Sequence, residues 1–101
     1  MMDTKTKTVL SRSYRNLNTN YRLSVKGHKT NKSELLIEVT NNSGEIEFRL
    51  FDGEKVEVLS LNNPESNLYN CELKPNEKYL LVIKSKAAVG SYSIKIKTYI
   101  D

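Results

Sequence analysis

The sequence contains one cysteine, one histidine and no tryptophan among its 101 residues. The single cysteine, Cys71, excludes an internal disulfide bond and a metal site built from several thiolates. We expect Cys71 to behave as a small buried apolar residue rather than as a nucleophile. The single histidine, His28, has no cysteine or carboxylate beside it in the sequence. We therefore interpret it as a solvated loop residue and not as a metal ligand.

Long apolar runs are also missing. No segment approaches the roughly 20 apolar residues that span a bilayer as a helix, so we expect no membrane span. The first ten residues, MMDTKTKTVL, lack the apolar stretch of about 7 to 15 residues that marks a secretion signal. Two localisations remain open: a cytoplasmic protein, or a module cut from a longer exported chain.

Patterns that support catalysis or metal binding are absent or sparse. A catalytic pair with a nucleophile would need His28 held within about 3 Å of it, which a flexible loop does not provide. Glu45 and Glu47 project from one side of a predicted strand, as glycosidase carboxylates do, but Arg49 shares that solvent-facing side. The pair Asp52 and Glu54 supplies too few oxygen ligands for calcium. We therefore predict no enzymatic activity, no cofactor and no metal site.

The composition indicates one small, basic domain. A chain of 101 residues buries roughly two-thirds of its unfolded surface on folding, which suffices for one modest core. The 16 basic and 12 acidic residues give a net charge of +4, which would permit a polyanionic partner. The lysines are spread over nearly every segment, however, and we interpret them as solvent-facing and edge residues of strands. Nucleic acid is therefore not an expected partner.

The clearest structural signal lies between residues 73 and 99. The apolar run from Tyr79 to Lys84 predicts a central strand with both faces covered. A loop is expected from Ser85 to Gly90, followed by a strictly alternating strand from Ser91 to Ile100. The alternation assigns Tyr92, Ile94 and Ile96 to the core and Ser93, Lys95 and Lys97 to solvent.

Tyr79 follows Leu73 and Pro75 at a spacing that two arrangements explain. The tyrosine hydroxyl can return to the backbone of the preceding turn, as in the tyrosine corner of β-sandwiches. Alternatively, the segment is a plain turn followed by an interior aromatic residue. The sequence favours neither.

The remaining segments predict short strands separated by polar turns. Residues 1–19 are expected to form a mobile N-terminal arm or an edge strand, and residues 20–101 a single domain. Turns are expected at 16–20 and at 41–44, where Asn and Gly tolerate positive φ. Further strands are predicted at 21–26, 34–40, 45–52, 56–61 and 68–73. The sequence therefore predicts an all-β, antiparallel β-sandwich of the jelly-roll or immunoglobulin-like kind, with about seven or eight strands.

The hairpin near Gly53 allows a prediction of register. A three-residue loop at 52–54 keeps the apolar residues of both strands on one face, and a slip by one residue would expose them. This register pairs Leu50 with Val56 and Phe48 with Val58, and places Arg49 across from Glu57.

Four stretches resemble a known family. They are YRLSVKG at 21–27, ELLIEVTNNSGEIEFRLFD at 34–52, LKPNEKYLLVI at 73–83 and GSYSIKI at 90–96. Their order resembles the bacterial pre-peptidase C-terminal domain, a β-sandwich that also serves as the collagen-binding module of clostridial collagenases. The family usually has Asp where Asn20 stands, and the acidic calcium cluster of the collagen binders is missing here. The resemblance therefore implies the fold and a binding role, without calcium or collagen.

Exposed side chains on the last strand are the candidate binding residues. Lys95, Lys97 and Tyr99 share its solvent-facing side, and tyrosine offers flat contact area suited to sugar rings and peptide backbones. We expect a non-catalytic accessory module that recognises a protein or polysaccharide surface. The alternative is a small stand-alone bacterial or phage protein that acts inside the cell through protein interactions, either as a single chain or as a homo-oligomer joined by edge strands.

Overall fold

The computed structural model describes residues 3–100 and contains only strands as regular secondary structure. The strands are β1 (Asp3–Lys26), β2 (Ser33–Phe51), β3 (Glu57–Asn62), β4 (Asn67–Leu73) and β5 (Lys78–Ile100). Every pairing between them is antiparallel. The prediction of an all-β antiparallel fold is therefore confirmed.

The five strands form one sheet in the order β1-β5-β2-β3, and β4 pairs with β2 beside β3. The central strand is β5, which is hydrogen-bonded to β1 on one side and to β2 on the other along nearly its whole length. The apolar run at 79–84 lies in this strand. β2 has β5 on one side, and on the other side β4 pairs with its first part and β3 with its last part.

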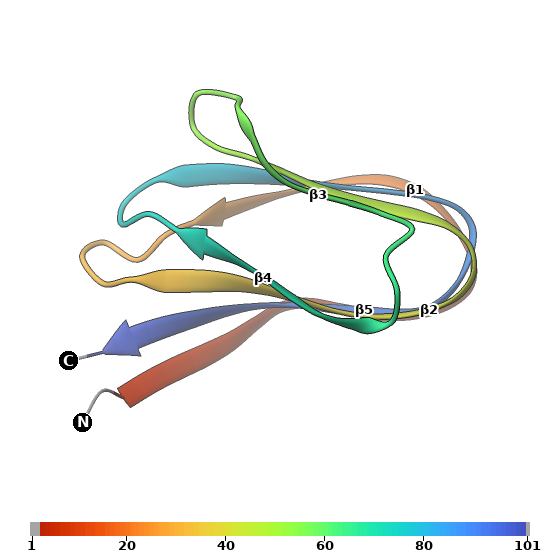
Figure 1. Cartoon of the computed structure of the whole chain (residues 1–101), viewed down its shortest axis with the longest axis horizontal. Coiled ribbons are helices and arrows are strands. Elements are labelled where there is room, and N and C mark those ends of the chain that lie inside the picture. The colour runs from red at the N-terminus through yellow and green to blue at the C-terminus, as the bar shows by residue number, and fades with distance from the viewer. Residues whose placement is uncertain (1–2, 101) are drawn as a thin grey trace.

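The three long strands bend together, so that the sheet folds over and two layers face each other (Figure 1). We name the layers after their short strands. The β4 layer contains residues 3–14, 33–41, 67–73 and 90–100, and the β3 layer contains residues 19–26, 46–51, 57–62 and 78–85.

The bend corrects three sequence predictions. The expected turns at 16–20 and 41–44 and the expected loop at 85–90 are not chain reversals, because β1, β2 and β5 continue through them. Register shifts in the ladders mark these places instead, as β-bulges do where a sheet bends sharply. The structure therefore has five strands rather than seven or eight.

Two glycines allow β2 and β5 to approach each other at the bend. Gly44 has φ 81° and Gly90 has φ 149°, which L residues with a side chain rarely adopt. A Cβ atom on Gly90 would lie 1.9 Å from the carbonyl oxygen of Thr40, and one on Gly44 would lie 2.0 Å from that of Ala87. The Asn and Gly signals that predicted turns are thus used to bend strands.

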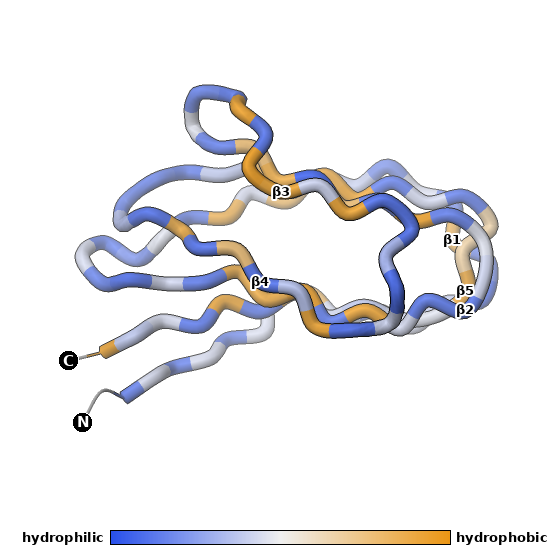
Figure 2. The backbone as a smooth tube through the Cα atoms, viewed as in Figure 1, coloured by the Kyte–Doolittle hydropathy of each residue, from blue (hydrophilic) through white to orange (hydrophobic). Residues whose placement is uncertain are grey.

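The core lies between the two layers. Phe48 of the β3 layer meets Tyr92 of the β4 layer edge to face, with ring centroids 5.5 Å apart. Leu35, Ile37 and Ile94 are fully buried in the same core cluster, so the inward face predicted for Ile94 is correct. In Figure 2 the hydrophobic residues lie along the strands, whereas the loops joining β1 to β2 and β4 to β5 are mostly hydrophilic.

The register predicted for β2 and β3 is wrong. Leu50 lies opposite Leu59 and Phe48 lies opposite Leu61, so two leucines cover the core where two valines were expected. Val56 and Val58 are 54% and 42% exposed instead.

The cause of this register is a longer loop at 52–56. The Oδ1 atom of Asp52 accepts hydrogen bonds of 2.9 Å from the backbone N–H groups of Glu54 and Val56. Lys55 takes a left-handed conformation with φ 64° inside the loop. The side chain of Asp52 thus stabilises a wider turn than the sequence suggested.

Candidate functional site

The three predicted binding residues lie on the outer side of β5 in the β4 layer, and two of them meet. The Nζ atom of Lys97 lies 5.3 Å from the centroid of the Tyr99 ring, and the Nζ atom of Lys32 lies 5.8 Å from it. The backbone around the ring is held in place, because Tyr99 N–H donates to the Lys32 carbonyl and the Asn31 side chain donates to the Tyr99 carbonyl. Tyr99 is thus an aromatic ring flanked by two cations.

The neighbouring strands surround these lysines with uncharged or acidic residues. Lys95 lies between Thr8 of β1 and Leu36 of β2. Lys97 lies between Thr6 and Glu34 in the same ladder. The surface is the outer face of a sheet, where side chains stand roughly perpendicular to it. It offers stacking and charge, but no enclosed site.

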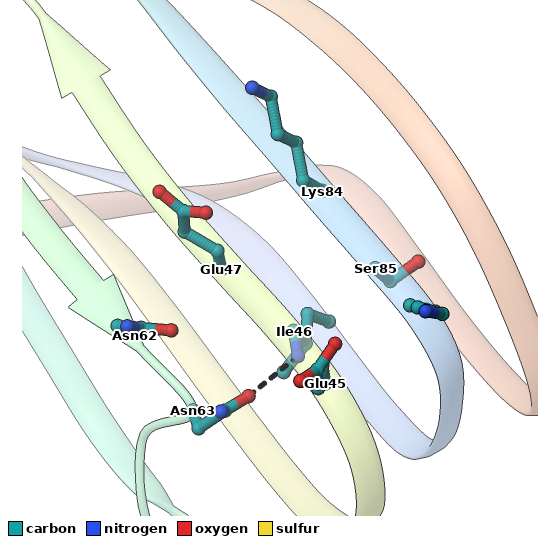
Figure 3. Close-up of a pocket in the computed structure, with 8 residues that line it drawn as sticks. Glu45, Ile46, Glu47, Asn62, Asn63, Lys84 and Ser85 are labelled. Carbon is teal, nitrogen blue, oxygen red and sulfur yellow. Dashed lines mark hydrogen bonds between the residues drawn. The ribbon is translucent and has the colours of Figure 1, made fainter.

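A depression of about 320 Å³ lies near the bend, on the outer side of the β3 layer (Figure 3). Its charged residues oppose each other across the strands, with Glu45 opposite Lys86 and Glu47 opposite Lys84. The lining residues are Glu45, Ile46, Glu47, Asn62, Asn63, Lys84, Ser85 and Lys86. The two acidic and two basic side chains of the lining balance in charge, and the hydroxyl of Ser85 is buried there without a hydrogen-bond partner among the described residues.

Asn63 fixes the rim of this depression. Its side-chain oxygen accepts a hydrogen bond of 2.9 Å from the backbone N–H of Ile46, as Figure 3 shows. Its own backbone N–H donates to the Ile46 carbonyl at 2.8 Å. Asn63 has φ 47°, a left-handed conformation that Asn tolerates. These contacts explain the residue as the end of β3, without a role for a ligand.

The cysteine and the histidine have ordinary structural surroundings. Burial raises the pKa of the Cys71 thiol, with a smaller contribution from Glu72, and a raised pKa disfavours the reactive thiolate. The Nδ1 atom of His28 accepts hydrogen bonds from the backbone N–H groups of Thr30 and Asn31. His28 thus orders the loop between β1 and β2.

Within residues 3–100, no group of three or more His, Cys, Asp and Glu side chains could hold a metal ion. The same residues include no helix long and apolar enough to cross a membrane.

Edge strands were expected from the sequence as a contact between copies, without an indication of which strands they are, and the structure identifies them. β1 pairs only with β5, so its other side is a free edge 24 residues long. We call it the β1 edge, and we call residues 52–77 the β3–β4 edge, since they comprise β3, β4 and the adjoining loops. Along residues 3–100, the exposed large hydrophobic side chains are Tyr21, Val56, Val58 and Leu68. All four belong to these two edges.

The structure also places residues 3–19, expected as a mobile arm or an edge strand, within β1. Val9, Leu10, Tyr14 and Leu17 pack against the core cluster from there. Met1 and Met2 of the expected arm lie outside the described residues. The sequence signal for this strand was weak because its apolar residues fall on bulges, which interrupt the period of two.

Comparisons with known proteins show a shared fold but identify no family. No family model matches the chain, and no curated protein matches it. A solved structure of Bacillus endospore appendages, described as disulfide-linked pili, matches 100% of this chain and 92% of its own with a TM-score of 0.55 and 8% identity. At that identity the match shows a shared fold alone.

Two further solved structures match at lower TM-scores. The P-domain of Macrobrachium rosenbergii nodavirus has a TM-score of 0.43 and 13% identity, over 96% of this chain and 91% of its own. A protein derived from the SPBc2 prophage has a TM-score of 0.40 and 14% identity, over 98% and 95%. None of the three structures is a pre-peptidase C-terminal domain.

Proposed function

We propose that this protein is a non-catalytic interaction domain that binds a protein partner through the β1 edge. The observation that carries the proposal is the length of that edge, a strand of 24 residues hydrogen-bonded on one side only. A free edge presents a row of unpaired N–H and C=O groups that can add a strand from another chain. Natural edge strands are usually short or covered, so an edge of this length is better explained as a binding surface.

The side chains of β1 support the same role. Tyr21 is 37% exposed, and aromatic residues with one open side are enriched in protein interfaces. Residues such as Lys5, Lys7 and Arg22 are exposed along the edge, and charges there discourage unselective pairing. The edge is therefore suited to a partner with complementary charge.

A second candidate function rests on Tyr99. A ring with the ammonium groups of Lys32 and Lys97 near it could stack on a sugar with acidic groups, which is the accessory role that the resemblance to pre-peptidase C-terminal domains implies. The flat face around Lys95 offers little enclosure. A glycan array with wild type and Tyr99→Ala tests this candidate, and equal binding by both proteins would exclude it.

For the architecture, we propose to treat the folded sheet as a β-sandwich with four strand segments in each layer. Counting each bent strand once in each layer accounts for the number of strands expected from the sequence. The shared fold with the Bacillus appendage structure is compatible with this description. Those appendages are pili, and assembly into larger structures is accordingly a role to test for this chain.

Paired proline substitutions test binding through the β1 edge. Consecutive N–H groups of an antiparallel edge strand point alternately into the sheet and away from it. One of the two variants, Thr6→Pro or Lys7→Pro, should therefore remove a hydrogen bond within the sheet and lower the melting temperature. The other should leave the melting temperature unchanged but abolish binding of the partner. Thr6→Ala serves as the control. The readouts are thermal unfolding, capture of partners, and hydrogen exchange of β1 in the purified complex.

The expected result is protection of β1 amides in the complex and loss of binding in the proline variant that remains stable. If that variant still binds, or if the partner protects residues 95–99 instead of β1, the proposal is wrong.

A further inference from the structure

Basic and acidic residues are separated across the sheet, although the net charge of the chain does not reveal this separation. β1 has six basic residues and one acidic residue, a net charge of +5, and its neighbour β5 has five lysines and no acidic residue, again +5. On the other side, β2 has a net charge of −3 and residues 52–77 have −4. Since the order is β1-β5-β2-β3 with β4 beside β3, one half of the sheet is basic and the other is acidic.

We infer that the partner of the β1 edge is the β3–β4 edge of a second copy of this chain. The two edges differ in the sign of their charge, so copies attract when unlike edges meet and repel when like edges meet. This inference rests on the proposed binding through the β1 edge and names its partner. Contacts between unlike edges are head-to-tail, and they generate rings or open filaments rather than closed pairs.

Both layers can continue into the next copy. In the β4 layer, residues 3–14 form one edge and β4 forms the other; in the β3 layer, residues 19–26 form one edge and β3 the other. β3 and β4 each pair with β2 alone, so their outer sides are free. The free strands β3 and β4 of one copy can thus meet the two free segments of β1 in the next copy. Each layer then continues into that copy through backbone hydrogen bonds, with the paired strands antiparallel or parallel.

Apolar side chains at both edges supply the burial that charge alone does not. Tyr21 lies on β1, Val58 lies on β3 and Leu68 lies on β4. Each is among the large hydrophobic residues left exposed in the single chain. Burial of apolar area contributes roughly 25 cal/mol per Å², whereas charges mainly set orientation and association rate. The edges therefore combine attraction with selectivity.

The basic residues of β1 could instead serve only to prevent unwanted strand pairing, but this role explains fewer of the observations. Lysine and arginine on an edge strand prevent pairing with any uncharged or basic strand. They do not explain why the far edge is acidic, with Asp52, Glu54, Glu57, Glu65, Glu72 and Glu77 against Lys55 and Lys74. Opposite signs on opposite edges are expected if the edges meet.

Charge reversal tests the inference. One variant carries Lys7→Glu, Arg15→Glu and Arg22→Glu on the β1 edge, and the other carries Glu54→Lys, Glu65→Lys and Glu72→Lys on the β3–β4 edge. All six side chains are exposed, so the fold should tolerate the changes. A third variant carries Lys7→Gln, Arg15→Gln and Arg22→Gln, which removes charge without reversing it. Circular dichroism and thermal unfolding verify that each variant is folded.

The measurement is sedimentation velocity with light scattering over a roughly hundredfold range of protein concentration. Wild type should self-associate at about 0.01 M salt, where the Debye length is about 30 Å, and should lose most of this association near 1 M, where it is about 3 Å. Each reversed variant alone should associate at least about tenfold more weakly than wild type. A mixture of the two reversed variants should regain association, because each then offers the edge that the other accepts.

Three results would overturn the inference: a wild type that stays monomeric at every salt concentration, reversed variants that associate alone as wild type does, or a mixture that stays monomeric although both variants are folded. The salt dependence of wild type tests the inference even if a variant does not fold. If wild type is monomeric and the stable proline variant still loses a captured partner, only the inference of self-association is refuted. Binding through the β1 edge would then stand, with another protein as the partner.

Discussion

The backbone N–H of Lys74 donates a hydrogen bond of 2.8 Å to the hydroxyl of Tyr79. Tyr79 is 6% exposed at the start of β5, and Lys74 follows the end of β4, so one side chain ties the turn to the core. The tyrosine corner is thus the arrangement present, of the two that the sequence left open. The same hydroxyl lies 3.2 Å from Glu77 Oε2, to which it donates.

Tyr79→Phe should lower the free energy of unfolding by about 1 to 3 kcal/mol, because the partly buried N–H of Lys74 loses its acceptor. Tyr69→Phe is the matched control. Its hydroxyl donates a 2.7 Å hydrogen bond to the Glu65 carbonyl at an exposed site, and water can replace it. Urea unfolding of both variants measures the difference. Equal losses would show that the corner bond has no special weight.

Ile94→Ala should cost about 2 to 5 kcal/mol, as removal of a buried aliphatic side chain does. Ile94 is fully buried and lies between Leu10 of β1 and Ile37 of β2. Lys95→Ala, one residue further on the outer face, should cost less than about 0.5 kcal/mol. Similar losses for the two variants in a urea melt would contradict the assignment of faces along β5.

The alternating patterns could be predicted from the sequence because side-chain direction in a strand depends only on local period. Tyr92 and Ile94 were assigned to the core on this basis, and both are buried. The path of the chain could not be predicted in the same way. Gly44 and Gly90 have the residue type of a turn, but a positive φ serves a bulge as well as a hairpin. Only the neighbouring strand decides between the two.

The register of β3 failed for a related reason. Both Val56 and Leu59 can cover a core, and the pattern favoured the three-residue loop because it placed the apolar residues of both strands on one face. The Asp52 side chain, which accepts two backbone hydrogen bonds, makes the longer loop stable. Arg49 and Glu57 still meet, with Nη2 and Oε2 2.9 Å apart, although the residue opposite Arg49 is Ser60. The long side chain of Arg49 thus reaches Glu57 diagonally across the two strands, although the two residues are not directly opposite.

The candidate surfaces were only partly accessible to sequence reasoning. Lys97 and Tyr99 share a face by alternation, and they do meet, but Lys32 comes from a loop distant in sequence. The charge order across the sheet depends on which strands are neighbours. Lysines that look evenly spread along the chain become concentrated once β1 and β5 lie side by side.

Gly90→Ala should destabilise the protein by roughly 2 kcal/mol or more, since the site combines a positive φ with a close approach to backbone. The added Cβ would lie 1.9 Å from the Thr40 carbonyl oxygen. Gly53→Ala is the control, because its nearest neighbour would lie at 3.5 Å and its φ is not positive. Thermal and urea unfolding should separate the two variants clearly. Tolerance of alanine at residue 90 would show that the bend does not require glycine.

The Arg49 guanidinium holds the pKa of the Glu57 carboxyl below its ordinary value, chiefly through their hydrogen bond. A carboxyl whose pKa is lower in the folded protein than in the unfolded chain stabilises the fold above the unfolded pKa, and this stabilisation is lost as pH falls through the folded pKa. Arg49→Gln should therefore raise the pKa of Glu57 and reduce the loss of stability on acidification. Carboxyl ¹³C shifts of Glu57 and urea unfolding between about pH 6 and 3 measure both effects.

Lys95→Gln is the matched control for this pair. It removes the same charge from another outer face of the sheet, where Lys95 lies between Thr8 and Leu36 rather than beside Glu57. It should leave the titration of Glu57 unchanged, because the hydrogen bond is a local contact and more distant charges are screened at ordinary salt. If Lys95→Gln shifts the titration as far as Arg49→Gln does, the pKa of Glu57 is set by the general charge of the sheet and not by the contact with Arg49.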